Sequence, residues 1–157
     1  GIRLNKFDWT EDFLKDYKEL LSEEFRNSVY SFNLSRLYFS QQKFSEIISL
    51  LLQVDHDELF MELDSKVLLM RTYYELEEER ALDSLIDSFS IYLRRNKQIS
   101  KDVKQQYLNV LRFVKKMAAV APYDRKAIQK IRQQIDACQA LADKNWVLKK
   151  IMELEGR

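Results

Sequence analysis

The feature that most constrains the fold of this chain is its near absence of glycine. Its 157 residues include two glycines, Gly1 and Gly156, and one proline, Pro122. Phosphate-binding loops, dinucleotide-binding turns and nucleophile elbows use glycine for close backbone approach or for positive φ. Tight hairpins favour Asn-Gly or Asp-Gly, and neither dipeptide occurs. The sequence therefore excludes the usual forms of these sites and argues against a hairpin-rich β architecture.

Helix signals fill the chain instead. Apolar residues recur at spacings of three and four, and no segment alternates as a strand does. Polar residues suited to N-capping stand before several of these apolar series, among them Ser100, Asp124 and Asp143. The expected helices begin at or just after Thr10, Ser22, Phe44, Leu59, Glu77, Ser100, Asp124 and Asp143. These signals predict an all-α protein of about seven or eight helices.

An internal repeat organises the predicted helices. Leu34-x3-Tyr38 recurs as Leu69-x3-Tyr73 after 35 residues, and Val103-x3-Tyr107 follows 34 residues later. Each of the three heads a helix–turn–helix pair.

The segment 34–47 resembles the tetratricopeptide repeat, which has Leu-Gly-x-x-Tyr in its first helix, a Gly-x-Tyr turn, and Ala-x3-Phe or Tyr in its second helix. Leu34 and Tyr38 match this pattern, but Ser35, Gln42 and Ile47 replace the small glycine, the turn glycine and the close-packing alanine. The segment 144–148 also resembles the C-terminal end of uncharacterised bacterial helical-repeat proteins.

The resemblance implies a single domain over 1–157, built as a right-handed α-α superhelix of stacked helix pairs. Its parts are a leading helix over 10–21, repeats over 22–54 and 58–96, a third repeat-like pair over 100–142, and a capping helix over 143–154. Stacking is also expected on physical grounds, because one helix pair cannot bury its apolar face alone. Tyr38, Tyr73 and Tyr107 are expected at equivalent packing points in the core.

In tetratricopeptide arrays the first helices line a groove, and the resemblance places that groove here by offset from each Leu. The implied groove residues are Phe32, Arg36, Phe39 and Ser40 in the first repeat, Val67, Arg71, Tyr74 and Glu75 in the second, and Lys101, Gln105, Leu108 and Asn109 in the third. Arg36 and Arg71 share one repeat position, where they would read carboxylates of a bound peptide between aromatic anchors. The Asn and Lys clamp of chaperone-binding repeats is not reproduced. The alternative is that both arginines pair with neighbouring acids on a solvated face.

Charge is divided unevenly along the chain. Residues 1–90 hold 10 Lys and Arg against 19 Asp and Glu, whereas residues 91–157 hold 16 against 6. The cations of the second part form a candidate basic patch: Arg94, Arg95, Lys97, Lys101, Lys104, Arg112, Lys115, Arg125, Lys126, Lys130 and Arg132. This pattern suits a solvated face, an acidic protein partner, a nucleic acid, or head-to-tail contact between copies of the chain. A protein-binding groove is the leading functional hypothesis, and a regulatory or nucleic-acid-associated role of the basic half is the alternative.

No enzymatic constellation stands out. The single cysteine, Cys138, and single histidine, His56, exclude an internal disulfide and a Cys/His zinc site. Cys138 is expected to be buried in an apolar stripe, and His56 to be a solvated loop residue. Glu75 and Glu77 to Glu79 would hold a metal only if the chain folded back, and an acid-rich helix start explains them more simply. We therefore expect a non-enzymatic protein without cofactor or metal, cytoplasmic and without a membrane span.

Overall fold

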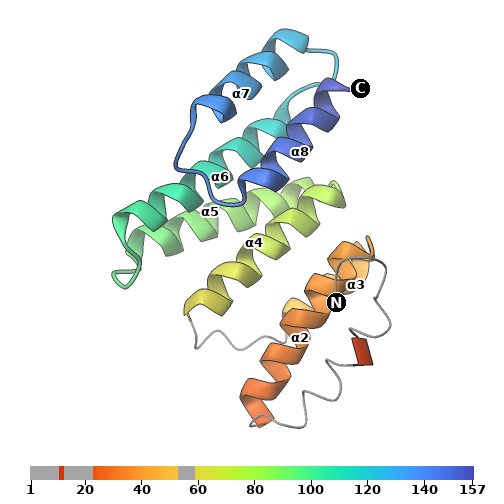
Figure 1. Cartoon of the computed structure of the whole chain (residues 1–157), viewed down its shortest axis with the longest axis vertical. Helices are drawn as coiled ribbons and strands as arrows, with labels where there is room; N and C mark the ends of the chain where they lie inside the picture. Colours follow the sequence, from red (N-terminus) through yellow and green to blue (C-terminus); the bar gives the residue numbers. More distant parts are fainter. Residues whose placement is uncertain (1–10, 13–22, 53–58) are drawn as a thin grey trace. The chain divides into compact units, whose positions relative to one another are not determined.

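The computed structural model of the chain describes residues 11–12, 23–52 and 59–157 (Figure 1). These residues are helical or lie in short connections between helices, which confirms the predicted all-α class for this part of the chain. Its seven helices are α2 (Glu23–Ser40), α3 (Phe44–Leu51), α4 (Leu59–Glu75), α5 (Glu79–Arg95), α6 (Lys101–Ala119), α7 (Arg125–Ala137) and α8 (Lys144–Glu155). Residues 11–12 are helical too. The rest of the predicted leading helix over 10–21, and His56, lie outside the described residues.

The chain divides into two compact units, Gly1–Glu78 and Glu79–Arg157. Each helix packs mostly against its neighbours in sequence. The boundary falls in the turn between α4 and α5, inside the segment 58–96 that the sequence assigns to one repeat. The single domain, the grouping into repeats and the superhelix stay predictions.

In the first unit, α2 packs on α3, α3 packs on α4, and α4 also contacts α2. Its core centres on Ile47, Leu51 and Leu68. Ser35, which stands where the repeat has a small glycine, is fully buried, and its hydroxyl donates to the carbonyl of Ser31 at 2.7 Å.

The turn between α2 and α3 is a Schellman motif. The amide of Lys43 donates to the carbonyl of Tyr38 at 2.9 Å, and the amide of Gln42 donates to that of Phe39 at 3.1 Å. Gln42 lies in the left-handed region with φ 60°. A glutamine therefore takes the conformation that the turn glycine of the repeat would take.

The same turn recurs after α4. The amide of Glu78 donates to the carbonyl of Tyr73 at 3.0 Å, the amide of Glu77 donates to that of Tyr74 at 3.2 Å, and Glu77 has φ 55°. Every position is displaced by 35 residues from its counterpart in the first turn, and α3 and α5 begin at Phe44 and Glu79 with the same displacement. The predicted 35-residue period is therefore present in the backbone at these two turns.

In the second unit, α6 packs against α5, α7 and α8, and α7 packs against α8. Phe89, Phe113, Ile135 and Ile151 are fully buried there, one from each of the four helices. This unit therefore has an apolar core drawn from all of its helices.

Of the N-caps predicted at Ser100, Asp124 and Asp143, the first two are confirmed. The Ser100 hydroxyl accepts from the amide of Val103 at 3.3 Å, and the Asp124 carboxylate accepts from the amide of Ala127 at 3.1 Å. Asp143 precedes α8 as predicted, but its backbone is left-handed and its side chain makes no capping hydrogen bond. Its predicted capping role was wrong because that backbone conformation differs from the extended one that an N-cap residue normally has.

The connection between α7 and α8 is held on α6 by polar contacts. The side-chain amide of Asn109 donates to the carbonyl of Ala140 at 2.7 Å and lies 3.4 Å from the Cys138 sulfur. The amide of Ala142 donates to the carbonyl of Gln106 at 3.2 Å. Because α7 ends at Ala137, Cys138 is half-buried in this connection and not in the apolar stripe that the sequence predicted.

Candidate functional site

The predicted groove residues of the first unit include one close pairing between helices. The guanidinium carbon of Arg71, on α4, lies 4.4 Å from the ring centroid of Phe39, on α2. The Phe39 ring in turn meets the edge of Phe44, with centroids 5.1 Å apart. A guanidinium stacked on an aromatic face keeps donors at its edge for hydrogen bonding. This contact therefore restrains the Arg71 guanidinium.

Arg36 and Arg71 occupy equivalent places, each four residues before the last residue of its helix. Their surroundings differ, because Arg36 is exposed and Arg71 is half-buried against Phe39. The structure thus supports the predicted equivalence in register and shows that one arginine is more restrained than the other.

Ser40 is exposed like Arg36, but the remaining groove residues of the first unit are less accessible. Phe32 and Phe39 are half-buried and pack against the core of Ile47, Leu51 and Leu68. Val67 is only 9% exposed, so it belongs to the interior. Of the groove residues that carry an aromatic ring or a charge, Arg36 is exposed, whereas Arg71, Tyr74 and Glu75 are half-buried.

The three tyrosines predicted as core packing points are all half-buried. Tyr38 packs against the core of the first unit, and Tyr107 lies with its ring centroid 6.1 Å from that of Phe89. Burial raises the pKa of Tyr38 above its ordinary 10.0, and the negative charges of Glu11 and Glu46 raise it further. Its phenol is therefore neutral at physiological pH, as a packing role requires.

One exposed helix face carries two predicted sites at once. Six residues of α6 lie within about 100° of the helix circumference: the predicted groove residues Lys101, Gln105 and Leu108, and the basic-patch residues Lys104, Arg112 and Lys115. We call these six residues the α6 face. Lys104 and Leu108 are half-buried and the other four are exposed, whereas Val110, Val114 and Met117 on the opposite side are buried. The structure thus places Lys101, Gln105 and Leu108 of the third groove segment on the same surface as the central part of the basic patch, whereas Asn109, also predicted for the groove, is buried.

The cations before α6 adjoin this face. Arg94, Arg95 and Lys97 are exposed, and the ammonium nitrogen of Lys104 lies 3.5 Å from the carbonyl of Arg94 at the end of α5. A cation at a helix C-terminus is favourable, because the last carbonyls of a helix lack partners. The contact of Lys104 with Arg94 therefore places the end of α5 next to the first turn of α6.

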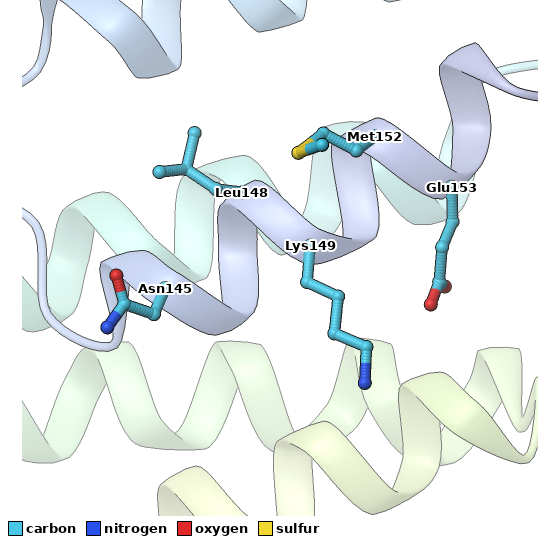
Figure 2. A pocket seen from close by; sticks show the side chains of 5 residues that line it. All are labelled: Asn145, Leu148, Lys149, Met152 and Glu153. Atoms are coloured by element: carbon cyan, nitrogen blue, oxygen red, sulfur yellow. The ribbon is translucent and has the colours of Figure 1, made fainter.

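A shallow depression on α8 was not anticipated from the sequence. Its volume is about 450 Å³, and the described residues that line it come from α8: Asn145, Leu148, Lys149, Met152 and Glu153 (Figure 2). Met152 is 57% exposed and Leu148 is half-buried. Leu148 and Met152 are four residues apart and so lie on one side of α8, and this spacing is the sequence signal that could have indicated the depression.

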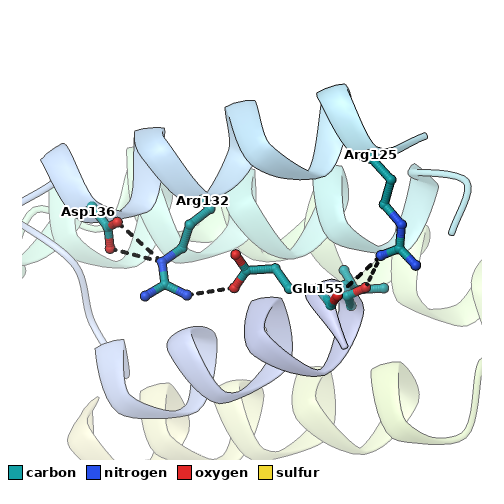
Figure 3. A network of polar contacts seen from close by, with 5 residues as sticks. Arg125, Arg132, Asp136 and Glu155 are labelled. Carbon is teal, nitrogen blue, oxygen red and sulfur yellow. Dashed lines mark hydrogen bonds and ion pairs between the residues drawn. The ribbon is translucent and has the colours of Figure 1, made fainter. Parts of the chain in front are cut away.

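Two of the four cations of α7, Arg125 and Arg132, contact the end of α8. Arg125 donates to the carbonyls of Leu154 and Glu155 at 3.0 and 3.3 Å, so it caps the end of α8 (Figure 3). Arg132 contacts the Asp136 carboxylate at 3.2 Å and that of Glu155 at 2.6 Å. The hydrogen bond that Arg132 donates to the Asp136 carboxylate is the main cause that raises the pKa of the Arg132 guanidinium. The predicted basic patch is therefore interrupted here.

Arg125, Lys126 and Lys130 are the exposed cations of α7, and of these three Arg125 contacts the end of α8. Like the cations of the α6 face, Lys126 and Lys130 point to solvent, but they belong to a different helix.

The carboxylates weighed as a metal site do not form one in the described part of the chain. Glu77, Glu78 and Glu79 are exposed, and no group of three His, Cys, Asp or Glu residues among the described residues is arranged to hold a metal ion. No described helix is long and apolar enough to cross a membrane.

Comparisons with protein-family models, with curated proteins and with solved structures gave no match.

Proposed function

We propose that this chain is a non-enzymatic, tetratricopeptide-like interaction module that binds a protein or peptide segment through the exposed faces of its first helices. The repeated packing supports this proposal. In the first unit α2 contacts both α3 and α4, and in the second unit α6 contacts both α7 and α8. In stacked helix pairs, each first helix contacts its own second helix and the next first helix. The two turns displaced by 35 residues fit the same scheme.

The observation that carries the proposal is the stacking of Arg71 on Phe39 at 4.4 Å. A free arginine side chain loses conformational entropy when it engages a carboxylate, and a guanidinium already held on a ring loses less. Such a residue is suited to bind a carboxylate of an incoming chain through two parallel hydrogen bonds. Arg36, at the equivalent position of α2, supplies a second cation.

The test is selection of random peptides displayed on phage against the full chain, followed by affinity measurement on variants. Replacing both Arg36 and Arg71 by Ala should weaken binding of the selected peptides about tenfold or more, since hydrogen bonds to charged groups contribute about 1.5–3 kcal/mol each. Arg71→Lys keeps the charge but loses the planar stack, so its effect should be intermediate.

The matched control replaces Arg80 and Arg157, which are exposed and outside the proposed surface. The double variant Arg80→Ala and Arg157→Ala removes the same charge and should leave affinity unchanged. The proposal fails if no peptide is enriched, or if the Arg36 and Arg71 variant binds as tightly as this control. Circular dichroism of each variant establishes that the helices are retained.

A further inference from the structure

We propose that the α6 face, on the second unit, selects its ligand by charge, and that this ligand is a short acidic protein segment with an apolar residue near its centre. This inference rests on the proposed function, because α6 is one of the first helices to which that proposal assigns binding, and it names the ligand class of this helix. It follows from the coincidence of groove and basic positions on one side of α6.

The charges of the α6 face lack compensation along the helix. The only acidic residue of α6 is Asp102, against five cations. Within the described part of the chain, no salt bridge involves Lys101, Arg112 or Lys115. Those three side chains are exposed, so a partner carboxylate can approach them with little desolvation of protein groups.

The spacing of the cations sets the length of the ligand. Lys101 and Lys104 form one pair, Arg112 and Lys115 form a second pair, and the half-buried Leu108 lies between them. A helix rises about 1.5 Å per residue, so Lys101 and Lys115 are about 21 Å apart along the axis. An extended chain covers that distance in about six or seven residues. Carboxylates at both ends and an apolar side chain in the middle match this pattern.

Nucleic acid fits the α6 face less well. Proteins that bind single strands combine cations with exposed aromatic rings on which bases stack. Phe113 is fully buried, and Tyr107 is half-buried against Phe89. Both aromatic residues of α6 are therefore turned toward the protein interior, which leaves cations and one leucine on the exposed side.

The test measures binding of a defined probe to the full chain by fluorescence anisotropy. The probe is a labelled seven-residue peptide with two glutamates at each end and a central leucine, acetylated and amidated so that only side chains carry charge. Binding should weaken at least tenfold between about 0.05 M and 0.5 M salt, because these exposed charges are screened. A peptide with lysines in place of the glutamates should not bind, and one with serine in place of leucine should bind more weakly.

Charge reversal locates the surface. The triple variant Lys101→Glu, Arg112→Glu and Lys115→Glu should weaken probe binding at least tenfold. The control variant Lys126→Glu, Lys130→Glu and Lys149→Glu changes the net charge equally at exposed positions of α7 and α8, and should bind within about twofold of the unmodified chain. Equal weakening in the two variants would show attraction to net charge alone and would overturn the proposal.

Two further outcomes would also overturn the inference. In the first, an oligodeoxythymidine of similar length binds more tightly than the peptide and displaces it, and the α6 triple variant loses this binding. That result would assign the face to nucleic acid. The other is the absence of probe binding by a chain that does enrich peptides through Arg36 and Arg71. In that case the proposed function stands and the selection by charge fails. Conversely, peptide binding that depends on α6 alone would refute the role of Arg36 and Arg71 and keep the α6 face.

Discussion

At the scale of single residues, Gln42 and Glu77 hold left-handed backbone conformations, with φ of 60° and 55°, in turns that close in the same way. A non-glycine residue in this region carries a steric cost of about 1–2 kcal/mol between Cβ and the carbonyl oxygen. The hydrogen bonds of the turn hold the conformation despite this cost. The absence of glycine from residues 2–155 therefore leaves strain at two helix ends that glycine would remove.

We predict that Gln42→Gly stabilises the protein. Relief of the left-handed strain favours the glycine variant, and the greater freedom of glycine in the unfolded chain offsets about 0.5–1 kcal/mol of that gain. The free energy of unfolding from urea denaturation should rise by up to about 1 kcal/mol. Gln41→Gly is the control, because Gln41 is not among the left-handed residues and glycine there should destabilise. Loss of stability in Gln42→Gly would show that the glutamine side chain contributes more than its backbone costs.

At the scale of the helix, α8 depends on residues of α7. Arg125 caps the last carbonyls of α8, and Arg132 contacts Glu155 in its final turn. Both contacts act near the negative end of the α8 dipole, where a cation is favourable. The position of this helix end is therefore set by two arginines from earlier in the chain.

We predict that Arg125→Ala loosens the end of α8. Removal of one charged donor from two carbonyls should cost about 1 kcal/mol locally. Amide exchange of the last turn of α8, followed by NMR, should accelerate about fivefold, while the amides of α6 change little. Lys126→Ala, at the next and exposed position of α7, should leave the last turn of α8 protected. Equal protection in Arg125→Ala would contradict a capping role.

Local patterns explain which elements the sequence could predict. The starts of α6 and α7 follow from Ser100 and Asp124, because each cap bonds an amide only three residues away. Asp143 looked equivalent, but its backbone conformation, set by the α7–α8 connection, prevents the same bond. The left-handed backbone of Asp143 could not be predicted from the polar residues around it.

The candidate sites were predictable to a smaller extent. The α6 face follows from helical spacing, whereas the role of Arg125 rests on carbonyls 29 and 30 residues away. Val67 occupied a groove position by offset, yet tertiary packing buries it. Burial and long-range pairing decide which charged or apolar residues face solvent, and one sequence alone does not contain that information.

At the scale of the whole molecule, charge follows the two units. Residues 79–157 hold 17 Lys and Arg against 9 Asp and Glu, whereas residues 1–78 hold 9 against 16. We therefore expect acidic ligands to be attracted to the second unit at long range. Salt should then lower their association rate more than it changes their dissociation rate. This is the behaviour expected if the α6 face recruits the ligand.

We predict that residues 79–157 fold without the first unit. This segment of about 80 residues has a core from all four of its helices, caps at α6 and α7, and a connection fixed by Asn109. Domains of this size bury enough apolar surface to be stable alone. The isolated fragment should show helical circular dichroism and one cooperative thermal transition.

The same fragment tests whether the α6 face is independent of the first unit. Every residue of the α6 face lies between positions 101 and 115, and contacts of this kind couple little to distant residues. The affinity of the fragment for the acidic peptide should therefore be within about threefold of that of the full chain. A fragment that melts without cooperativity and binds a hydrophobic dye would show that α5 to α8 need the first unit to form a packed core. A fragment that folds cooperatively but no longer binds the peptide would instead place part of the ligand contact in the first unit, where Arg36 and Arg71 lie.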